Sequence, residues 1–133
     1  MRRKALLLLG LFVLAVLAEG CIGEGKEGQG YTVKVVKNGQ ALKEYTLSDL
    51  KKFKMVEFTV DGKVQEGPAL EDLLKGFSYQ KVTLIGVNGE MELTKNQVKE
   101  VILDFTHRGT VKMASKSIPK SEWIKDIYEI KLG

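Results

Sequence analysis

The chain has 133 residues, of which 21 are Lys or Arg and 17 are Asp or Glu, giving a formal net charge of +4. Arg2, Arg3 and Lys4 precede a long apolar segment, so the rest of the chain is nearly balanced in charge. A nearly balanced charge gives no case for nucleic-acid binding, which requires a clustered basic surface. Its single cysteine, Cys21, excludes an intramolecular disulfide.

The first predicted element is a secretory signal peptide over residues 1–20. Residues 5–18 are almost entirely apolar, and as a helix they would be only about 20 Å long, against about 30 Å for the hydrocarbon core of a membrane. A basic start, a short apolar core and small residues before a cleavage point are typical of a secretory signal. A buried core helix is the alternative, but the segment has no polar face.

The segment Leu17-Ala18-Glu19-Gly20-Cys21 resembles the lipobox of prokaryotic lipoprotein signal peptides. The resemblance implies that the Cys21 thiol receives a diacylglycerol-type lipid and that cleavage makes Cys21 the new N-terminus. Ala18 stands where Leu is more usual, and Glu19 is an unusual neighbour. The alternative is ordinary secretion with a free thiol near the cleavage point. Because two acyl chains hold a protein durably on a membrane, we expect a lipid anchor on the outer face of the cell membrane.

Residues 21–30 are predicted to form a flexible tether, since four glycines are interspersed with Glu, Lys and Gln. Residues 31–133 then suffice for a single globular domain with one core.

In chain order, this domain is predicted to begin with a hairpin and a capped helix. Period-two alternation predicts a strand at residues 33–35. The Asn-Gly pair at 38–39 favours a hairpin turn into a second strand at 41–45. Thr46 and Asp49 then have the spacing of a capping box, which predicts a short helix.

A strand at 56–60 and an Asp-Gly turn at 61–62 are predicted next. Pro68 is suited to the first turn of a second helix. The apolar residues of that helix follow an i, i+3, i+4, i+7 pattern and are Leu70, Leu73, Leu74 and Phe77.

The second half of the domain repeats the order of the first. Residues 82–84 and 91–93 predict strands on either side of an Asn-Gly turn, and Thr94 with Gln97 predicts another capped helix. This order indicates either an internal duplication or convergence.

The last predicted elements are all strands. Residues 101–105 are apolar enough to form a central strand, and a turn at 107–109 leads into a strand at 111–113. Alternating Tyr, Ile and Leu at 128–132 predict a final strand on which Tyr128 shares a face with Ile130.

Three segments together carry a family resemblance: a Gly-x-x-Leu-x-x-Leu-Leu turn at residues 67–74, the Asn-Gly pair at 88–89, and a Trp-hydrophobic-Lys-x-Ile strand at 123–130. Their order over residues 45–132 resembles the molybdopterin-binding domain of the sulfite oxidase and YedY-like oxidoreductases. The resemblance implies an α+β fold with a mixed, mostly antiparallel sheet of short strands and two or three short helices.

The chain departs from this family where its chemistry is concerned. Enzymes of the family ligate molybdenum through a cysteine thiolate, a soft ligand suited to that metal. No cysteine follows Cys21, which the lipid would occupy. The resemblance therefore implies the scaffold and argues against its redox chemistry. We expect no cofactor and no metal, and molybdopterin enters only through the resemblance.

Side chains in and near two turns are the candidates for a ligand-binding surface, and they are Asn88, His107, Arg108, Lys112 and Lys116. His107 has no His or Cys near it in sequence, so an exposed turn residue is the alternative to a base or metal ligand. The lysines would bind an anion or a lipid headgroup, or else form a solvated face. Neither a nucleophile elbow nor a phosphate loop is present, so no catalytic residue is predicted.

Three functions follow from these patterns. The first is a non-catalytic, lipid-anchored domain that binds a small ligand or a partner protein. The second is an oxidoreductase or cofactor carrier that holds a molybdopterin-type cofactor without the cysteine ligand. The third is a structural subunit associated with a membrane protein.

Overall fold

The computed structural model describes residues 30–133. The predicted signal peptide, Cys21 and the tether up to residue 29 lie outside the described residues. None of the helices in the described part has the length and hydropathy needed to span a membrane.

Strands dominate the described residues, with three α-helices of four or five residues between them. The elements in chain order are β1 (Val33–Lys37), β2 (Gln40–Tyr45), α3 (Leu47–Lys51), β3 (Met55–Val60), β4 (Lys63–Pro68), α4 (Leu70–Leu73), β5 (Lys81–Gly86), β6 (Gly89–Thr94), α5 (Lys95–Val98), β7 (Val101–Phe105), β8 (Val111–Ser115), the 3-10 helix η4 (Lys120–Glu122) and β9 (Ile127–Leu132). The predicted small α+β fold is confirmed at this level.

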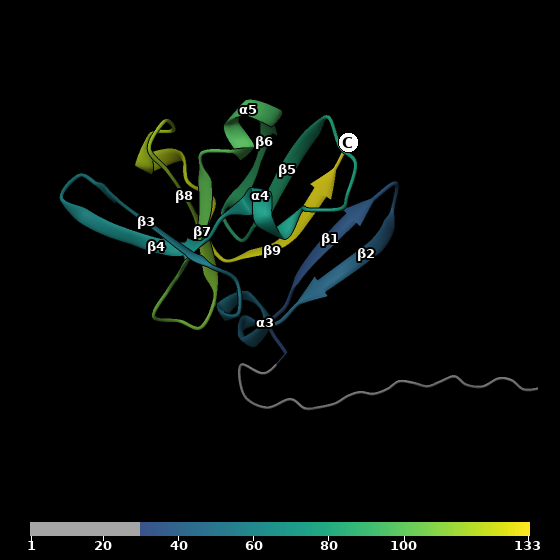
Figure 1. Ribbon diagram of the computed structural model, residues 1–133, viewed down its shortest axis with the longest axis horizontal. Helices are drawn as coiled ribbons and strands as arrows, with labels where there is room; N and C mark the ends of the chain where they lie inside the picture. The colour runs from purple at the N-terminus through teal and green to yellow at the C-terminus, as the bar shows by residue number, and fades with distance from the viewer. Residues whose placement is uncertain (1–29) are drawn as a thin grey trace, which may run out of the picture. The chain divides into compact units, whose positions relative to one another are not determined.

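The main sheet has five strands in the order β2-β1-β9-β5-β6 (Figure 1). β9 lies in its centre, parallel to β1 and antiparallel to β5. The outer pairs, β1 with β2 and β5 with β6, are antiparallel hairpins. The first and last strands of the domain are therefore neighbours, with Lys34 paired to Glu129.

Two further hairpins, β3–β4 and β7–β8, stand apart from the main sheet in Figure 1. A bridge between Ala69 and Ile102 joins the end of β4 to β7. The prediction of a central strand over residues 101–105 is correct for the strand itself, but β7 lies beside β4 and β8 rather than in the five-stranded sheet. Its apolar residues face the core, where Leu103 is 0% exposed.

The predicted turns and caps are present. Asn38 and Gly39 take φ values of 53° and 76°, the left-handed conformation that a tight hairpin turn requires. Thr46 Oγ1 accepts a hydrogen bond from the Asp49 amide at 3.1 Å, and the carboxylate of Asp49 accepts one in return from the amide of Thr46 at 3.0 Å. Thr94 and Gln97 form the same reciprocal pair. Each box satisfies two amides at a helix start.

The second helix is shorter than predicted and begins later. Pro68 is the last residue of β4, and α4 begins at Leu70 after Ala69, which bridges to Ile102. Gly76, with φ of 89°, turns the chain before Phe77. Pairing with Met55 of β3 takes Pro68 into a strand, where its fixed φ is tolerated at the strand end.

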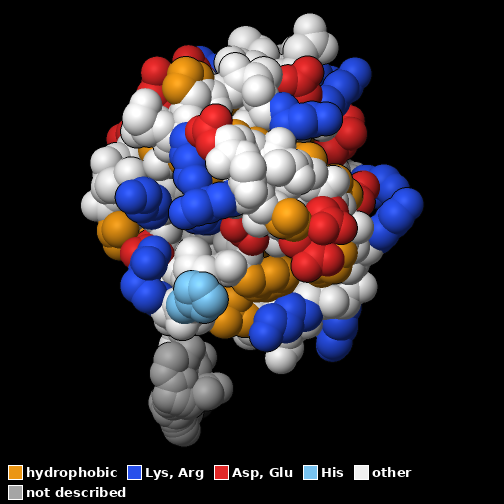
Figure 2. Space-filling model, turned by 90° about the vertical axis from the view of Figure 1, so that its left-hand side faces the viewer, with side chains coloured by type: hydrophobic (Ala, Val, Ile, Leu, Met, Phe, Trp, Pro, Cys, Tyr) orange, Lys and Arg blue, Asp and Glu red, His pale blue; other side chains and the backbone are white. Residues whose placement is uncertain are grey.

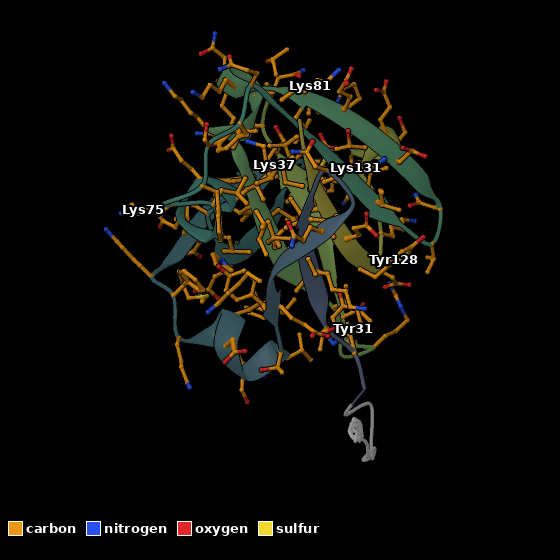
Figure 3. All side chains as sticks on the ribbon, turned by 90° about the vertical axis from the view of Figure 1, so that its right-hand side faces the viewer. Tyr31, Lys37, Lys75, Lys81, Tyr128 and Lys131 are labelled. Carbon is orange, nitrogen blue, oxygen red and sulfur yellow. The ribbon has the colours of Figure 1, made fainter. Side chains whose placement is uncertain are left out.

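The register of β9 differs from the predicted alternation. Ile85 pairs with Glu129 and Gly86 pairs with Ile127, so Tyr128 is an extra residue in a bulge. Ile127 is consequently buried, while Tyr128, which Figure 3 labels, is 47% exposed. A single extra residue reverses the face on which the preceding side chains lie.

One core cluster joins the main sheet to the hairpins and α4. Trp123 is 2% exposed, and its Nε1 donates to the carbonyl of Ile118 at 2.9 Å. The two halves of the domain repeat one order: a hairpin, a Thr-capped helix and a second hairpin. The repetition suggested by the sequence therefore extends to the order of the elements.

Candidate functional site

An open cleft of about 490 Å³ lies between β4 and the turn that joins β7 to β8. We call it the basic cleft, because Lys63, Arg108, Lys112 and Lys125 line it and Asp104 is the one carboxylate residue in its lining. His107 and Gln65 line it as well. Figure 2 shows the histidine on a face of the domain where Lys and Arg side chains gather.

Hydrogen bonds within the β7–β8 turn hold its backbone in place. Thr106 Oγ1 accepts hydrogen bonds from the amides of Arg108 and Thr110, at 3.1 and 3.3 Å. Gly109, with φ of 79°, supplies the left-handed residue that closes the turn. The backbone of His107 and Arg108 is therefore held in place by hydrogen bonds on both sides.

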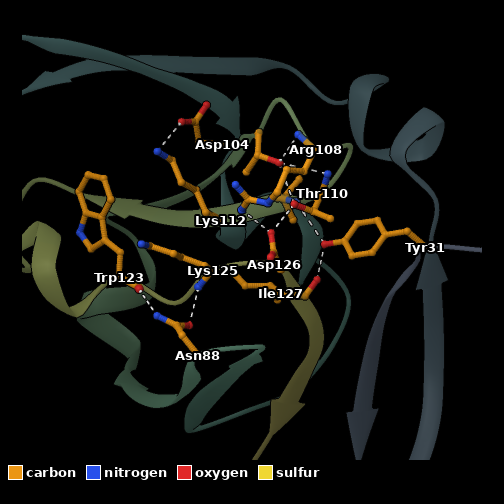
Figure 4. A network of polar contacts seen from close by, with 12 residues as sticks. Tyr31, Asn88, Asp104, Arg108, Thr110, Lys112, Trp123, Lys125, Asp126 and Ile127 are labelled. Atoms are coloured by element: carbon orange, nitrogen blue, oxygen red, sulfur yellow. Dashed lines mark hydrogen bonds and ion pairs between the residues drawn. The ribbon is translucent and has the colours of Figure 1, made fainter. Parts of the chain in front are cut away.

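Asp126 ties this turn to the start of β9 (Figure 4). Its Oδ1 accepts from Arg108 Nη2 at 2.6 Å and from Thr110 Oγ1 at 2.5 Å. The hydrogen bonds from Arg108 and then Thr110 hold the pKa of the Asp126 carboxyl below its usual value. Nη2 of the Arg108 guanidinium is thus already engaged in an ion pair with Asp126.

Tyr31 links the same region to the start of the domain. Its hydroxyl donates to the carbonyl of Ile127 and accepts from the amide of Val111, the latter at 3.2 Å. Burial raises the pKa of Tyr31 to about 12, and the negative charge of Asp126 acts in the same direction. The phenol therefore stays protonated and keeps donating over the whole physiological pH range.

Asp104 connects the two walls of the basic cleft. Its Oδ1 accepts from the amide of Glu66 on β4 at 3.3 Å. Its Oδ2 lies 3.7 Å from Lys112 Nζ, directly across the β7–β8 hairpin. Lys112 Nζ also lies 5.8 Å from the centre of the Trp123 ring. The ammonium of Lys112 is therefore shared between a carboxylate and an aromatic face.

Asn88 has a structural role beside the basic cleft rather than in its lining. Its Nδ2 donates to the carbonyl of Trp123 at 3.1 Å, and its Oδ1 accepts from the amide of Lys125 at 2.8 Å. The side chain thereby clamps the segment that brings Lys125 to the cleft, as Figure 4 shows. Both polar side-chain atoms of this predicted site residue therefore form hydrogen bonds with the backbone.

Lys116 lies elsewhere. It lines a second cavity of about 480 Å³, and its Nζ lies 5.7 Å from the centre of the Phe58 ring. Of the five residues predicted from the sequence, the structure thus brings His107, Arg108 and Lys112 together. Asn88 lies outside the lining of the basic cleft, and Lys116 lines the second cavity.

Gln65, which the sequence did not indicate, is the most unusual polar residue of the basic cleft. It is only 2% exposed, and its Oε1 has no hydrogen-bond partner among residues 30–133. An unpaired buried acceptor costs about 1–3 kcal/mol. Folded proteins pair nearly all such groups, so Gln65 is an exception among residues 30–133.

The side chains of residues 30–133 can be compared with those that a metal ion, or the cofactor implied by the family resemblance, would require. Within residues 30–133 no group of three His, Cys, Asp or Glu side chains is placed to hold a metal ion. These residues include no cysteine, so they do not supply the thiolate through which that family ligates molybdenum. The residues present therefore do not fit a thiolate-ligated molybdenum centre.

Comparison with known protein families finds no family model that matches this sequence, and comparison with curated proteins finds no match.

Proposed function

We propose that this protein is a lipid-anchored lipoprotein on the outer face of the cell membrane, and that its domain is a non-catalytic module that binds a small anionic ligand in the basic cleft. The lipobox-like segment that ends at Cys21 supports the anchor. The charge of the cleft lining supports the ligand. A tether over residues 21–30 would let the domain reach its ligand from the membrane.

The observation that supports the binding proposal is the excess of positively charged side chains around the basic cleft, whose walls are held in place before a ligand binds. Four Lys or Arg residues and one carboxylate residue line the basic cleft. Hydrogen bonds accepted by Asp126, Asp104 and Asn88 fix its walls in advance. A preformed site loses less entropy on binding than a mobile one. Positive charges gathered at an opening also attract an anion. Its volume lies in the range of small-molecule sites.

Support for a non-catalytic role comes from His107, the one imidazole in the lining of the basic cleft. A general base is normally oriented by a third group. Among the described residues, no carboxylate forms a hydrogen bond or ion pair with His107. We infer from the sequence resemblance alone that the scaffold is sulfite-oxidase-like, without the thiolate on which the redox function of that family depends.

The anchor is tested by expressing the full chain in a prokaryotic host and determining the mass of its N-terminal peptide. We expect a diacylglycerol-type modification on Cys21 and recovery of the protein with the membrane fraction. Cys21→Ser is the matched control and should release the chain from that fraction. An unmodified Cys21 thiol, or a chain found in the cytosol, would contradict the proposal.

Binding is tested on the mature, detergent-solubilised chain with sulfate and succinate, two anions without a hydrogen-bond donor at neutral pH. We expect backbone NMR shifts confined to the basic cleft, weaker binding in Lys125→Gln, and unchanged binding in Lys116→Gln at the other cavity. Equal effects of the two variants would contradict the cleft as the site. Pterin fluorescence in an extract of natively produced protein would instead favour the cofactor carrier.

A further inference from the structure

The two Asn-Gly pairs of the domain occupy different places in their hairpins. Asn38 and Gly39 together form the loop between β1 and β2. In the second hairpin, Gly89 is the first residue of β6 and is paired with β5, so only Asn88 lies in the loop. Both asparagines are exposed. Access to water therefore does not distinguish the two pairs, whereas the backbone of the glycine does.

The side chains of the two asparagines also differ in their contacts. Nδ2 of Asn88 donates to the carbonyl of Trp123 at 3.1 Å, and Oδ1 accepts from the amide of Lys125 at 2.8 Å. The side chain of Asn38 forms no hydrogen bond with residues 30–133. A Cβ placed on the neighbouring Gly39 would have nothing within 4 Å. The described part of the chain thus holds the carboxamide of Asn88 at both ends and leaves that of Asn38 unrestrained.

An unrestrained Asn-Gly pair is chemically reactive. The backbone nitrogen of the glycine attacks Cγ of the asparagine and forms a new N–C bond. The side-chain nitrogen takes up the proton of that amide and leaves as ammonia, so that a cyclic succinimide remains. Water then cleaves one of the two C–N bonds of the ring and gives either aspartate or isoaspartate. Water is the only co-reactant, and glycine has no Cβ to obstruct the attack.

The two pairs differ in what must be disrupted before this attack. Cγ of Asn88 reaches the next backbone nitrogen only after both side-chain hydrogen bonds break and Gly89 leaves its pairing with β5. For Asn38, only the exposed loop has to rearrange. That loop joins β1 to β2, an outer strand of the main sheet (Figure 1). Opening of such a peripheral segment takes less free energy than disruption of an interior one.

We propose that Asn38 is a site of spontaneous deamidation in the folded domain, and that hydrogen bonds protect Asn88 from the same reaction. The modification replaces a neutral amide with a carboxylate at the tip of the β1–β2 hairpin. In the isoaspartate product the backbone also passes through the former side-chain carbon, which lengthens the loop and loosens the pairing of β2 with β1. The proposal is independent of the anchor and of the basic cleft.

The experiment follows both sites in one sample. The mature, detergent-solubilised chain is incubated in a mildly alkaline buffer, and peptide mapping by mass spectrometry measures the exchange of NH₂ for OH over time. We expect Asn38 to react at least about tenfold faster than Asn88, whose two hydrogen bonds must break first. Chromatography separates the aspartate and isoaspartate products. In urea, where both hairpins are unfolded, the two sites should react at similar rates.

The loop between β3 and β4 provides a matched internal control. Asp61 and Gly62 form it, and φ of Asp61 is 50°, against 53° for Asn38. An ionised carboxylate is a much poorer electrophile than an amide, so isoaspartate should form far more slowly at Asp61. Asn38→Asp should abolish the mass change at this loop, and it should fold because Asp61 already adopts the same conformation. Thermal unfolding checks that variant.

Three outcomes would overturn the proposal. Equal rates at Asn38 and Asn88 in the folded chain would show that the hydrogen bonds give no protection. A folded chain in which neither site reacts, although both react in urea, would show that the β1–β2 hairpin protects Asn38 as well. A tenfold difference that persists in urea would assign the preference to the neighbouring residues in the sequence and not to the structure.

Discussion

The carbonyl oxygen of Leu103 on β7 occupies the place where a side chain on Gly67 of β4 would begin. A Cβ built on Gly67 would lie 1.8 Å from that oxygen. The two hairpins that form the walls of the basic cleft therefore approach each other backbone to backbone, and only glycine permits this distance. Replacing Gly67 tests how far the cleft depends on that contact.

Gly67→Ala should destabilise the domain by about 3 kcal/mol or more, because the clash is with backbone and β4 must move away from β7. Urea unfolding measures the loss. Gly30→Ala is the matched control, since nothing lies within 4 Å of a Cβ at that position. Equal stability of the two variants would show that β4 does not approach β7 this closely.

Tyr31→Phe should remove one component from the alkaline titration of the tyrosines, the component with a pKa of about 12. The pKa of Tyr31 is raised in the folded state, so its stabilising effect is complete below the ordinary value of 10.0 and is lost as the pH rises towards 12. Ultraviolet absorbance of the phenolate follows the titration. Tyr128→Phe, at an exposed residue, should leave that component in place.

The same substitution leaves the amide of Val111 without its acceptor. We expect Tyr31→Phe to cost about 1–2 kcal/mol at neutral pH. A stability equal to that of the unchanged protein would mean that solvent replaces the phenol at this amide.

Asp126→Asn should lower stability at neutral pH by about 1 kcal/mol or less, because the Arg108 partner is largely exposed. Asn suits the left-handed backbone at this position, where φ is 49°. The pKa of Asp126 is lowered in the folded state, so its contribution is present above the ordinary value of 3.8 and disappears as the pH falls through the lowered value. Urea unfolding from pH 7 downward should show the two proteins converging below about pH 4. A constant difference would contradict the assignment.

Asn88→Asp should destabilise the segment that holds Lys125. The variant keeps the acceptor for the amide of Lys125 but loses the donor to Trp123, so a carboxylate oxygen faces a carbonyl. We expect a loss of about 1–3 kcal/mol and faster hydrogen exchange at the Lys125 amide. Asn96→Asp, at an exposed position of α5, is the control and should change neither.

The parts of the fold that were predictable from the sequence are those set by near neighbours. The Asn38-Gly39 turn and the caps at Thr46 and Thr94 each depend on residues within four positions. β4 was not predicted, because Val64 is 58% exposed while Gln65 is buried. A strand whose polar residue faces the interior gives no apolar alternation to detect.

The basic cleft was predictable only on one side. The turn residues His107 and Arg108 are adjacent in the sequence, so a local pattern is enough to indicate them as candidate site residues. Lys63 and Lys125 meet them through the pairing of distant segments, which no local pattern encodes. The bulge at Tyr128 is equally invisible, since it results from how β9 aligns with β5.

The parallel pairing of β1 with β9 has a consequence for biosynthesis. The main sheet lacks its middle strand until β9 has left the ribosome, and contacts between segments so distant in sequence form slowly. If the chain is exported as we propose, its main sheet can be completed only after the β9 segment has crossed the membrane.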